Sequence, residues 1–462
     1  MTDEFFDEAN FAPDALEAAG ALSPTFDPGY EYPSDPQVAR ALEHWRDLKL
    51  GVIIHWGLYS SFGQAGSWSL HRESLGDFTD KAYGFDGDDA AYHRWYFERR
   101  HHFNGDDFDA AHWAKLCAQA GMKYVVFTTK HHDGFALYDT KYSNLKTTAE
   151  DCPLQRDIFR EVTDSFRAEG LETGVYFSKA DWARPDYWDL AQPVTDRFPN
   201  YDVAADPERW DRFVQFSHDQ VRELLTGYGP MNVLWLDAGW VRAPELDFKI
   251  DELAAMARSI QPGILMVDRE VHGPHENYRT PEQEIPDRYL DYPWESCVTW
   301  TRSWCSERKD DPAKPTHVIV ANLLRIVARG GNYLVGFGPD ATGALSAHVE
   351  RGLKELGAWM DAHGSGIHGT RAVSQPPSIT QTSGLTHEWL YVVKGNEAYL
   401  YGVPDSGRAS NASVTIDQPI PSAQILGGGS AAVVVEGGAT TLELTPSPDE
   451  LAYVVKLDAA AE

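Results

Sequence analysis

The chain has 462 residues, which is too long for one compact core and indicates two domains or three. Apolar residues make up 42% and charged residues 24%, as in an ordinary soluble globular protein. A net charge of −30 argues against nucleic acid and anionic membranes as partners, and the chain lacks the unbroken apolar run of a membrane span.

The N-terminal sequence, MTDEFFDEANFAPD, lacks the basic start, apolar run and cleavage site of a secretory signal. The four cysteines are widely scattered and show no metal-type CxxC spacing, which favours free thiols in a reducing compartment. We therefore expect a cytoplasmic protein. Residues 1–36, rich in Pro, Asp and Gly, are expected to form an N-terminal arm.

From residue 37 onward, helical stretches alternate with short apolar runs. The expected helices cover 37–48, 107–120, 157–169, 207–227, 248–260, 316–329 and 347–362. The apolar runs cover 51–56, 123–135, 172–178, 231–240, 263–269, 297–304 and 331–339. This alternation predicts parallel strands covered by helices, and seven runs favour an α/β fold of the (β/α) TIM-like barrel type over 37–365.

The pattern changes after the last of these helices. Residues 366–462 contain short alternating segments such as EWLYVVKG, EAYLYGV and TTLELTP, separated by Gly, Pro, Asn and Asp. This pattern is typical of a β-sandwich. Because its strands carry few ionisable groups, we expect this C-terminal domain to be a structural support, with sugar binding as the alternative.

Reactive side chains stand at the ends of almost all the apolar runs. They are His55, the group from Lys130 to Asp133, Tyr176, Asp237 and Arg269. The C-terminal ends of barrel strands meet on one face, where enzymes of this fold place their active sites. We therefore expect these side chains to share one site.

Asp237 follows the run VLWL and is the sharpest catalytic candidate. A carboxylate held rigidly at the mouth of a strand suits the nucleophile of a glycoside hydrolase, whereas an N-cap for the next segment is the alternative. Such a reaction also requires a second carboxyl group, and we expect the loop at 266–288 to supply it. The candidates there are Glu270, Glu276, Glu282 and Glu284, and the residues alone leave the choice open.

His131 and His132 raise the question of a metal site. Adjacent residues on an extended chain point to opposite sides, and the chain has neither an HExxH helix nor a cysteine cluster. We expect no metal and no other cofactor. Hydrogen bonding to sugar hydroxyls fits the imidazoles better, because each offers a donor and an acceptor.

Several long motifs follow one another in order: GVIIHWGLYS, KYVVFTTKHHDGF, LETGVYFS, VLWLDAGW, DREVHGPHENYRTPEQEIP and GGNYLVGFGPDATGALS. With these motifs the chain resembles glycoside hydrolase family 29, the α-L-fucosidases, through the whole expected barrel. The resemblance implies a retaining exo-glycosidase with a carbohydrate substrate and a covalent glycosyl-enzyme. It implies Asp237 as the nucleophile and Glu282, in the triplet Thr280-Pro281-Glu282, as the acid/base.

The resemblance also implies sugar contacts from His55, His131, His132, Tyr176 and Arg269, and an aromatic wall beside the C5 methyl group from Trp304. Many family members read Glu-Trp-Tyr where this chain reads Arg94-Trp95-Tyr96, and their Glu binds sugar hydroxyls. Only Trp95 carries over here, so we expect Trp68 or Glu73 to complete the pocket.

The departure at Arg94 leaves a related sugar such as an α-L-galactoside open. Two alternatives from other classes are a non-catalytic carbohydrate-binding relative and a metal-dependent hydrolase. The sequence also leaves a homo-oligomer open.

Overall fold

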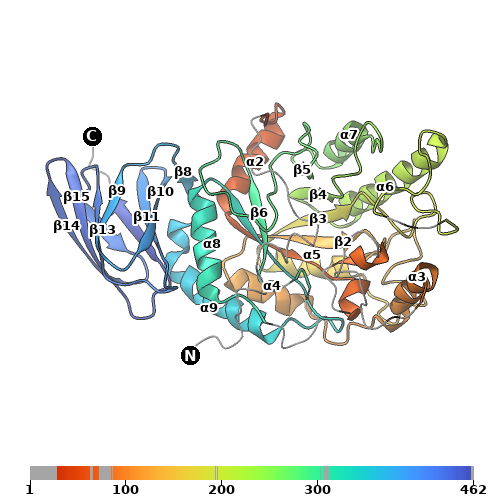
Figure 1. Cartoon of the computed structure of the whole chain (residues 1–462), viewed down its shortest axis with the longest axis horizontal. Coiled ribbons are helices and arrows are strands. Elements are labelled where there is room, and N and C mark those ends of the chain that lie inside the picture. Colours follow the sequence, from red (N-terminus) through yellow and green to blue (C-terminus); the bar gives the residue numbers. More distant parts are fainter. Residues whose placement is uncertain are drawn as a thin grey trace.

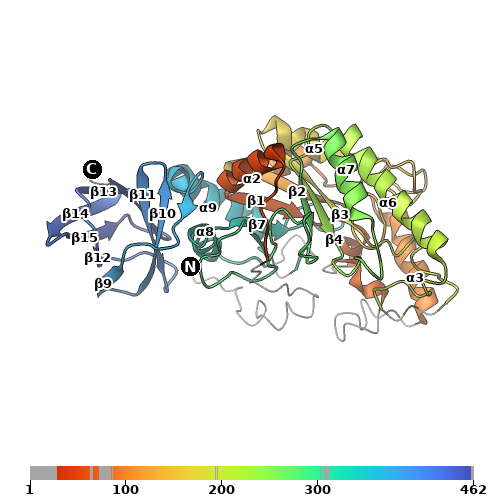
Figure 2. The same cartoon turned by 90° about the horizontal axis from the view of Figure 1, so that it is seen from above.

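The computed structural model describes residues 29–62, 66–71, 85, 87–192, 194, 196–301, 303–305 and 312–458. Figures 1 and 2 show a helix-covered parallel sheet and, beyond α8 (Thr316–Ala328) and α9 (Ala347–His363), antiparallel sheets at one end of the molecule. The predicted fold class, a barrel-like domain followed by a β-sandwich, is confirmed.

The parallel sheet has seven strands, one for each predicted run. They are β1 (Leu50–Ile54), β2 (Tyr124–Lys130), β3 (Glu172–Ser178), β4 (Val233–Asp237), β5 (Leu265–Asp268), β6 (Glu295–Thr299) and β7 (Asn332–Phe337). Their order is β5-β4-β3-β2-β1-β7-β6, and every pairing is parallel. The strands are buried almost throughout, as expected of a sheet with both faces covered.

An irregular segment, residues 275–283, spans the gap between the edge strands β5 and β6. Its first part runs antiparallel to β5, where the Asn277 N–H donates to the Met266 carbonyl at 2.8 Å. Its last part runs parallel to β6, where the Gln283 N–H donates to the Cys297 carbonyl at 2.8 Å. The sequence predicted a loop here, and the structure shows that this loop joins the two edges of the curled sheet.

Helices that lie between the strands cover the sheet. They are α2 (Pro36–Leu48), α4 (Ala110–Gln119), α5 (Ile158–Ala168), α6 (Pro207–Gly227) and α7 (Ile250–Ile260), together with α8 and α9. Asp35, Asp109, Asp157 and Asp206 cap four of them, because each carboxylate accepts a backbone N–H of the first turn. All seven predicted helices are present. The sequence missed α3 (Asp89–Glu98), whose aromatic side chains do not follow one helical face.

Two antiparallel sheets face each other in the C-terminal part. The first has the order β13-β16-β11-β10-β8 and contains β8 (Arg371–Ala372), β10 (His387–Lys394), β11 (Glu397–Pro404), β13 (Ser422–Ile425) and β16 (Tyr453–Asp458). The second has the order β14-β15-β12-β9 and contains β9 (Ile379–Gly384), β12 (Ala412–Ile416), β14 (Gly429–Glu436) and β15 (Ala439–Pro446). Their inner faces form a hydrophobic core of their own, which includes Leu400, Val414, Leu442 and Val455.

The domain limits remain a proposal. We place the C-terminal domain at 366–462 because α9 ends at His363 and β8 begins at Arg371. Residues 1–28 of the expected arm lie outside the described residues. The part that follows packs on the segment at 275–283, because the Tyr30 hydroxyl donates to the Asn277 carbonyl at 2.5 Å. No helix in the described ranges has the length and apolar character needed to cross a membrane.

Candidate active site

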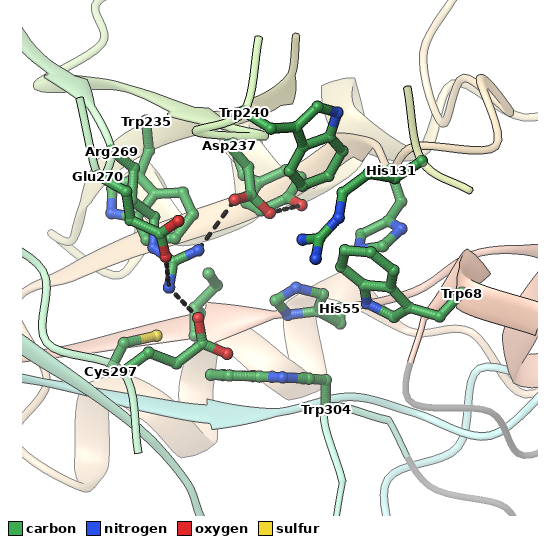
Figure 3. A pocket seen from close by; sticks show the side chains of 14 residues that line it. His55, Trp68, His131, Trp235, Asp237, Trp240, Arg269, Glu270, Cys297 and Trp304 are labelled. Atoms are coloured by element: carbon green, nitrogen blue, oxygen red, sulfur yellow. Dashed lines mark hydrogen bonds and ion pairs between the residues drawn. The ribbon is translucent and has the colours of Figure 1, made fainter. Parts of the chain in front are cut away.

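A pocket opens at the C-terminal ends of the barrel strands and contains most of the predicted site residues (Figure 3). Its lining consists of Ile53, His55, Trp68, His131, Tyr176, Arg197, Trp235, Asp237, Trp240, Arg269, Glu270, Glu282, Cys297 and Trp304. The expectation that side chains at separate strand ends share one site therefore agrees with the geometry for His55, His131, Tyr176, Asp237 and Arg269. Lys130 and Asp133 do not line the pocket, because Lys130 pairs with Asp181 and Asp133 accepts the Tyr96 hydroxyl.

Asp237 ends β4, two side chains hydrogen-bond to its carboxylate, and a third lies nearby. The Tyr176 hydroxyl donates to Oδ2, Arg269 Nη1 donates to Oδ1 at 3.0 Å, and His132 Nε2 lies 3.9 Å from Oδ2. Burial alone would raise the pKa of Asp237, but the charge of Arg269, the nearby His132 and the hydrogen bond from Tyr176 hold it below its ordinary value. Asp237 is therefore a carboxylate ready to act as a nucleophile.

Glu282 lies on the segment that joins β5 to β6. Its backbone is fixed on β6, because the Cys297 N–H donates to the Pro281 carbonyl at 3.0 Å and the next residue bonds back to Cys297. Its carboxyl group pairs with Arg269 Nη2. Burial raises the pKa of Glu282 to about 7 against the lowering effect of Arg269, and the charge of Asp237 adds to the rise. This carboxyl can hold a proton near neutral pH.

One guanidinium thus joins the two carboxyl groups, as the dashed lines in Figure 3 mark. Arg269 contacts Asp237 through Nη1 and Glu282 through Nη2. The environments push the two pKa values in opposite directions, so that one group is ionised while the other holds a proton. Such a pair carries the acid and nucleophile roles of a glycosidase.

The backbone turns sharply after each of the three charged residues. Ala238, Glu270 and Gln283 directly follow them and adopt left-handed conformations with φ of 70°, 65° and 52°. Residues other than glycine in this region cost on the order of 1–2 kcal/mol each. Strain of this kind gathers at functional sites, where it fixes the preceding side chain in place.

Three histidines lie close to Asp237 in uncharged form. Burial lowers the pKa of His55 and of His132 to about 3, and it lowers that of His131 as well. Ser67 Oγ hydrogen-bonds His131 Nδ1 at 2.5 Å, which leaves His131 Nε2 for a ligand. Neutral imidazoles can donate to or accept from sugar hydroxyls.

His132 lies behind the pocket surface and does not line it. Its ring packs on Trp68 at 4.9 Å and on Trp240 at 5.1 Å between centroids, while Nδ1 bonds Ser178 Oγ at 2.7 Å. It therefore acts on Asp237 from behind, and the predicted direct sugar contact by His132 does not follow from this geometry.

The two adjacent histidines do not diverge as expected. β2 ends at Lys130, so His131 and His132 lie in a turn rather than on an extended strand, and their ring centroids are 4.0 Å apart. With Asp237 they form a group whose ligand atoms all lie within 4.8 Å of one another. The Asp237 carboxylate is already engaged by Arg269 and Tyr176, and the absence of a metal cofactor stays a prediction.

Trp304 forms an apolar wall of the pocket. Its ring packs against His55 at 4.9 Å and lies directly over Gly336 of β7. A Cβ at Gly336 would lie 2.4 Å from the Trp304 ring, so only glycine leaves room for this wall.

Trp68, and not Trp95, lies in the pocket. Trp68 belongs to η3 (Ser67–Leu70), whereas α3 directs Trp95 against Tyr92, 5.5 Å away, with Arg99 over its ring at 4.8 Å. Within the described residues, Trp95 does not line this pocket, and other side chains of α3 line a second cleft, so the sugar contact by Trp95 stays a prediction. Arg94 is exposed and lines that second cleft, and Glu73 lies outside the described residues.

The other acid/base candidates differ in position. Glu276 is buried away from the pocket, where it accepts the His272 N–H at 2.7 Å, and Glu284 does not line the pocket. Glu270 does line it and lies 3.1 Å from Arg269 Nη2, but its side chain is 26% exposed against 11% for Glu282. Glu270 is therefore the alternative acid/base, and experiments must distinguish its role from that of Glu282.

Sequence reasoning missed several lining residues. Ile53 and Trp235 stand two residues before His55 and Asp237, so the alternation of side chains along a strand could have found them. Trp240 lies within a quoted motif, next to Gly239, where a Cβ would come within 2.8 Å of the Arg269 carbonyl. Arg197 comes from a loop without periodic pattern and gave no signal.

Alpha-L-fucosidases of other organisms are similar to this chain over most of its length. The chain is 28% identical over 389 residues to an alpha-L-fucosidase of Dictyostelium discoideum, covering 80% of each chain. It is 28% identical over 402 residues to the plasma alpha-L-fucosidase of Homo sapiens, covering 83% of this chain and 80% of the human protein.

Solved structures are similar over nearly the whole chain. Alpha-L-fucosidase isoenzyme 1 from Paenibacillus thiaminolyticus matches with a TM-score of 0.73 and 28% identity, covering 92% of this chain and 100% of that one. A trapped covalent intermediate of a Bacteroides thetaiotaomicron family 29 enzyme with 2-fluoro-fucosyl fluoride matches with a TM-score of 0.71 and 25% identity, covering 94% and 98%. The family model described as alpha-L-fucosidase matches residues 20–365. The family resemblance seen in the sequence and the enzyme class that it implies are thereby confirmed. The chain belongs to the alpha-L-fucosidase family of glycoside hydrolases.

Proposed function

We propose that this protein hydrolyses terminal α-L-fucosides by double displacement, with Asp237 as the nucleophile and Glu282 as the acid/base. The observation that carries the assignment is the joint contact of both carboxyl groups with Arg269, together with their opposite pKa shifts. In a retaining glycosidase the two carboxyl groups lie about 5–5.5 Å apart, a spacing that one guanidinium can bridge.

In the first step, an oxygen of ionised Asp237 attacks the anomeric carbon. Glu282 gives its proton to the glycosidic oxygen, so the leaving group departs as an alcohol while an ester forms to Asp237. Negative charge disappears from Asp237 as it appears on Glu282. Because Arg269 contacts both groups, one cation stabilises the charge before and after the transfer.

In the second step, water attacks the same carbon and breaks the ester. Glu282 takes the proton of that water and returns to its acid form, and Asp237 is released as a carboxylate. Two inversions at the anomeric carbon give net retention. The Tyr176 hydroxyl stays on Oδ2 of Asp237 and orients the carboxylate in both steps.

The remaining lining residues suit a deoxy sugar. His55 and His131 offer neutral imidazoles to hydroxyl groups, whereas the Trp304 ring offers an apolar face to the C5 methyl group. Trp68, which was expected to complete the sugar pocket, lines it as well. An α-L-galactoside would set a hydroxymethyl group, rather than a methyl group, against Trp304.

The proposal is tested by assaying the purified protein on aryl α-L-fucoside, α-L-galactoside and β-D-arabinopyranoside. We expect the fucoside to have the highest kcat/KM, and NMR of the first-formed product to show the α-anomer. A first-formed β-anomer, or no turnover of any of the three glycosides, would overturn the proposal. A cytoplasmic location is proposed from the sequence alone, and cell fractionation tests it.

A further inference from the structure

Arg197 is a cation in the pocket that the reaction scheme does not use. It lines the pocket, and its guanidinium carbon lies 5.1 Å from the ring centre of Trp240 and 5.8 Å from that of Trp68. Within the described ranges, no carboxylate pairs with it. Arg269, by contrast, contacts three carboxylates. The two tryptophan faces hold the Arg197 cation but accept no hydrogen bond from the N–H groups at its edge.

Aromatic side chains hydrogen-bond to the backbone at Arg197 and hold it in place. The Arg197 carbonyl accepts from Tyr187 OH at 2.8 Å and from Trp182 Nε1 at 3.3 Å. The next carbonyl, that of Phe198, accepts from Trp188 Nε1 at 2.8 Å. The rings of Trp182 and Trp188 are stacked with centroids 4.8 Å apart. These hydrogen bonds fix the backbone at Arg197 and Phe198, while the Arg197 side chain lines the pocket.

The pocket has a buried floor and a half-buried rim. His55, Tyr176 and Trp304 are at most 7% exposed, whereas Trp68, Trp240 and Arg197 are intermediate in exposure. A terminal sugar that reaches Asp237 is enclosed by the floor, and the rest of the substrate must leave past the rim. Arg197 therefore lies beside the path of the leaving group.

We propose that Arg197 binds an anionic group, a carboxylate or a sulfate ester, on the saccharide that leaves. This inference rests on the proposed function and adds the class of its substrate. A guanidinium presents a fork of donors that matches the oxygens of such anions, and it stays charged at all working pH values. The chain carries a net charge of −30, and the carboxyl groups of Asp237 and Glu270 in the same pocket share one cation, Arg269. Without a second cation, this field would repel an acidic leaving group.

The test compares aryl α-L-fucosides whose leaving groups differ in charge. We would measure kcat/KM for 4-carboxyphenyl, 4-sulfophenyl and 4-(methoxycarbonyl)phenyl α-L-fucoside. The ester is a better leaving group than the carboxylate, so intrinsic reactivity opposes the expected preference. We expect the wild-type protein to favour the carboxylate, the sulfonate or both over the ester by about tenfold, the value of one charge-assisted hydrogen bond. The preferred anion identifies the natural group as a carboxylate or a sulfate.

In Arg197→Gln, the ratio of anionic to ester kcat/KM should fall to about one or below, and Arg197→Lys should keep part of it. Arg94→Gln removes the same charge outside the pocket and is the matched control, which should keep the wild-type ratio. In the wild-type protein, added KCl should reduce the ratio, a readout that requires no variant. A wild-type preference for the ester over both anions, or a ratio unchanged in Arg197→Gln, would overturn the inference. Failure to hydrolyse the neutral ester at all would count against the proposed function instead.

Discussion

The basic limb of the pH profile should belong to Glu282. Burial and the neighbouring charges of Asp237 and Glu270 raise the pKa of Glu282 to about 7, although Arg269 opposes this. Because the pKa is raised, the protonated acid is present below about pH 7 and is lost as the pH rises through that value. The pKa of Asp237 is held below its ordinary range, so the nucleophile stays ionised on the acid side.

The size of the effect follows from this pKa. Above pH 7 each further pH unit leaves about a tenth of the protonated Glu282, so kcat/KM should fall about tenfold per unit. The acid limb should lie well below neutral pH. Glu282→Ala should lower kcat/KM for phenyl α-L-fucoside by about 10²–10⁴-fold, the usual contribution of a positioned general acid. With α-L-fucosyl fluoride, whose leaving group needs no proton, the loss should be small.

The assay is kcat/KM against pH for both substrates in the wild-type protein, Glu282→Ala and Glu270→Ala. The last variant is the matched control, because Glu270 contacts the same guanidinium. Removal of the Glu270 charge should move the basic limb to lower pH, since that charge raises the pKa of Glu282. A limb near pH 7 that survives in Glu282→Ala, or vanishes in Glu270→Ala, would refute the choice of acid/base.

Asp237→Ala should lose turnover by about 10³-fold or more, and azide should restore part of it, whereas near-normal turnover would exclude a nucleophilic role. Trp68→Ala should raise KM for aryl fucosides, while Trp95→Ala should leave their kinetics unchanged; a raised KM in Trp95→Ala would support the sugar contact that the sequence predicts for Trp95. Lys130→Met should destabilise the fold by about 3–5 kcal/mol in urea unfolding, because it strands the buried carboxylate of Asp181, 2.8 Å from Lys130 Nζ. The double variant with Asp181→Leu should recover most of this loss, and an equal loss in both would contradict the ion-pair explanation.

The sequence was informative where local pattern decides structure. The apolar runs and their polar ends depend on strand periodicity, which is enough to predict that His55, Tyr176, Asp237 and Arg269 share one face. The position of Glu282 was harder to predict from residues alone. Its place depends on backbone bonds between the segment at 275–283 and two strands far away in the chain, and no local periodicity encodes such bonds.

In two places the side chains point differently from what the sequence suggested. The motif Arg94-Trp95-Tyr96 looks like a sugar-binding segment, but in α3 the Trp95 ring packs on Tyr92, about one helical turn earlier, and Trp95 does not line the pocket. The divergence expected for the pair His131 and His132 assumed an extended chain, although β2 ends one residue earlier. In both cases the direction of a side chain depended on where an element ends or packs, which the sequence does not determine locally.

Covalent trapping provides the sharpest test of the double-displacement scheme. Glu282→Gln would be incubated with 2-deoxy-2-fluoro-α-L-fucosyl fluoride, digested with a protease and mapped by mass spectrometry. The scheme predicts one fluorofucosyl ester on the peptide that contains Asp237, and no label in Glu282→Gln/Asp237→Asn. A label on Glu270 or on any other residue, with Asp237 unmodified, would contradict it.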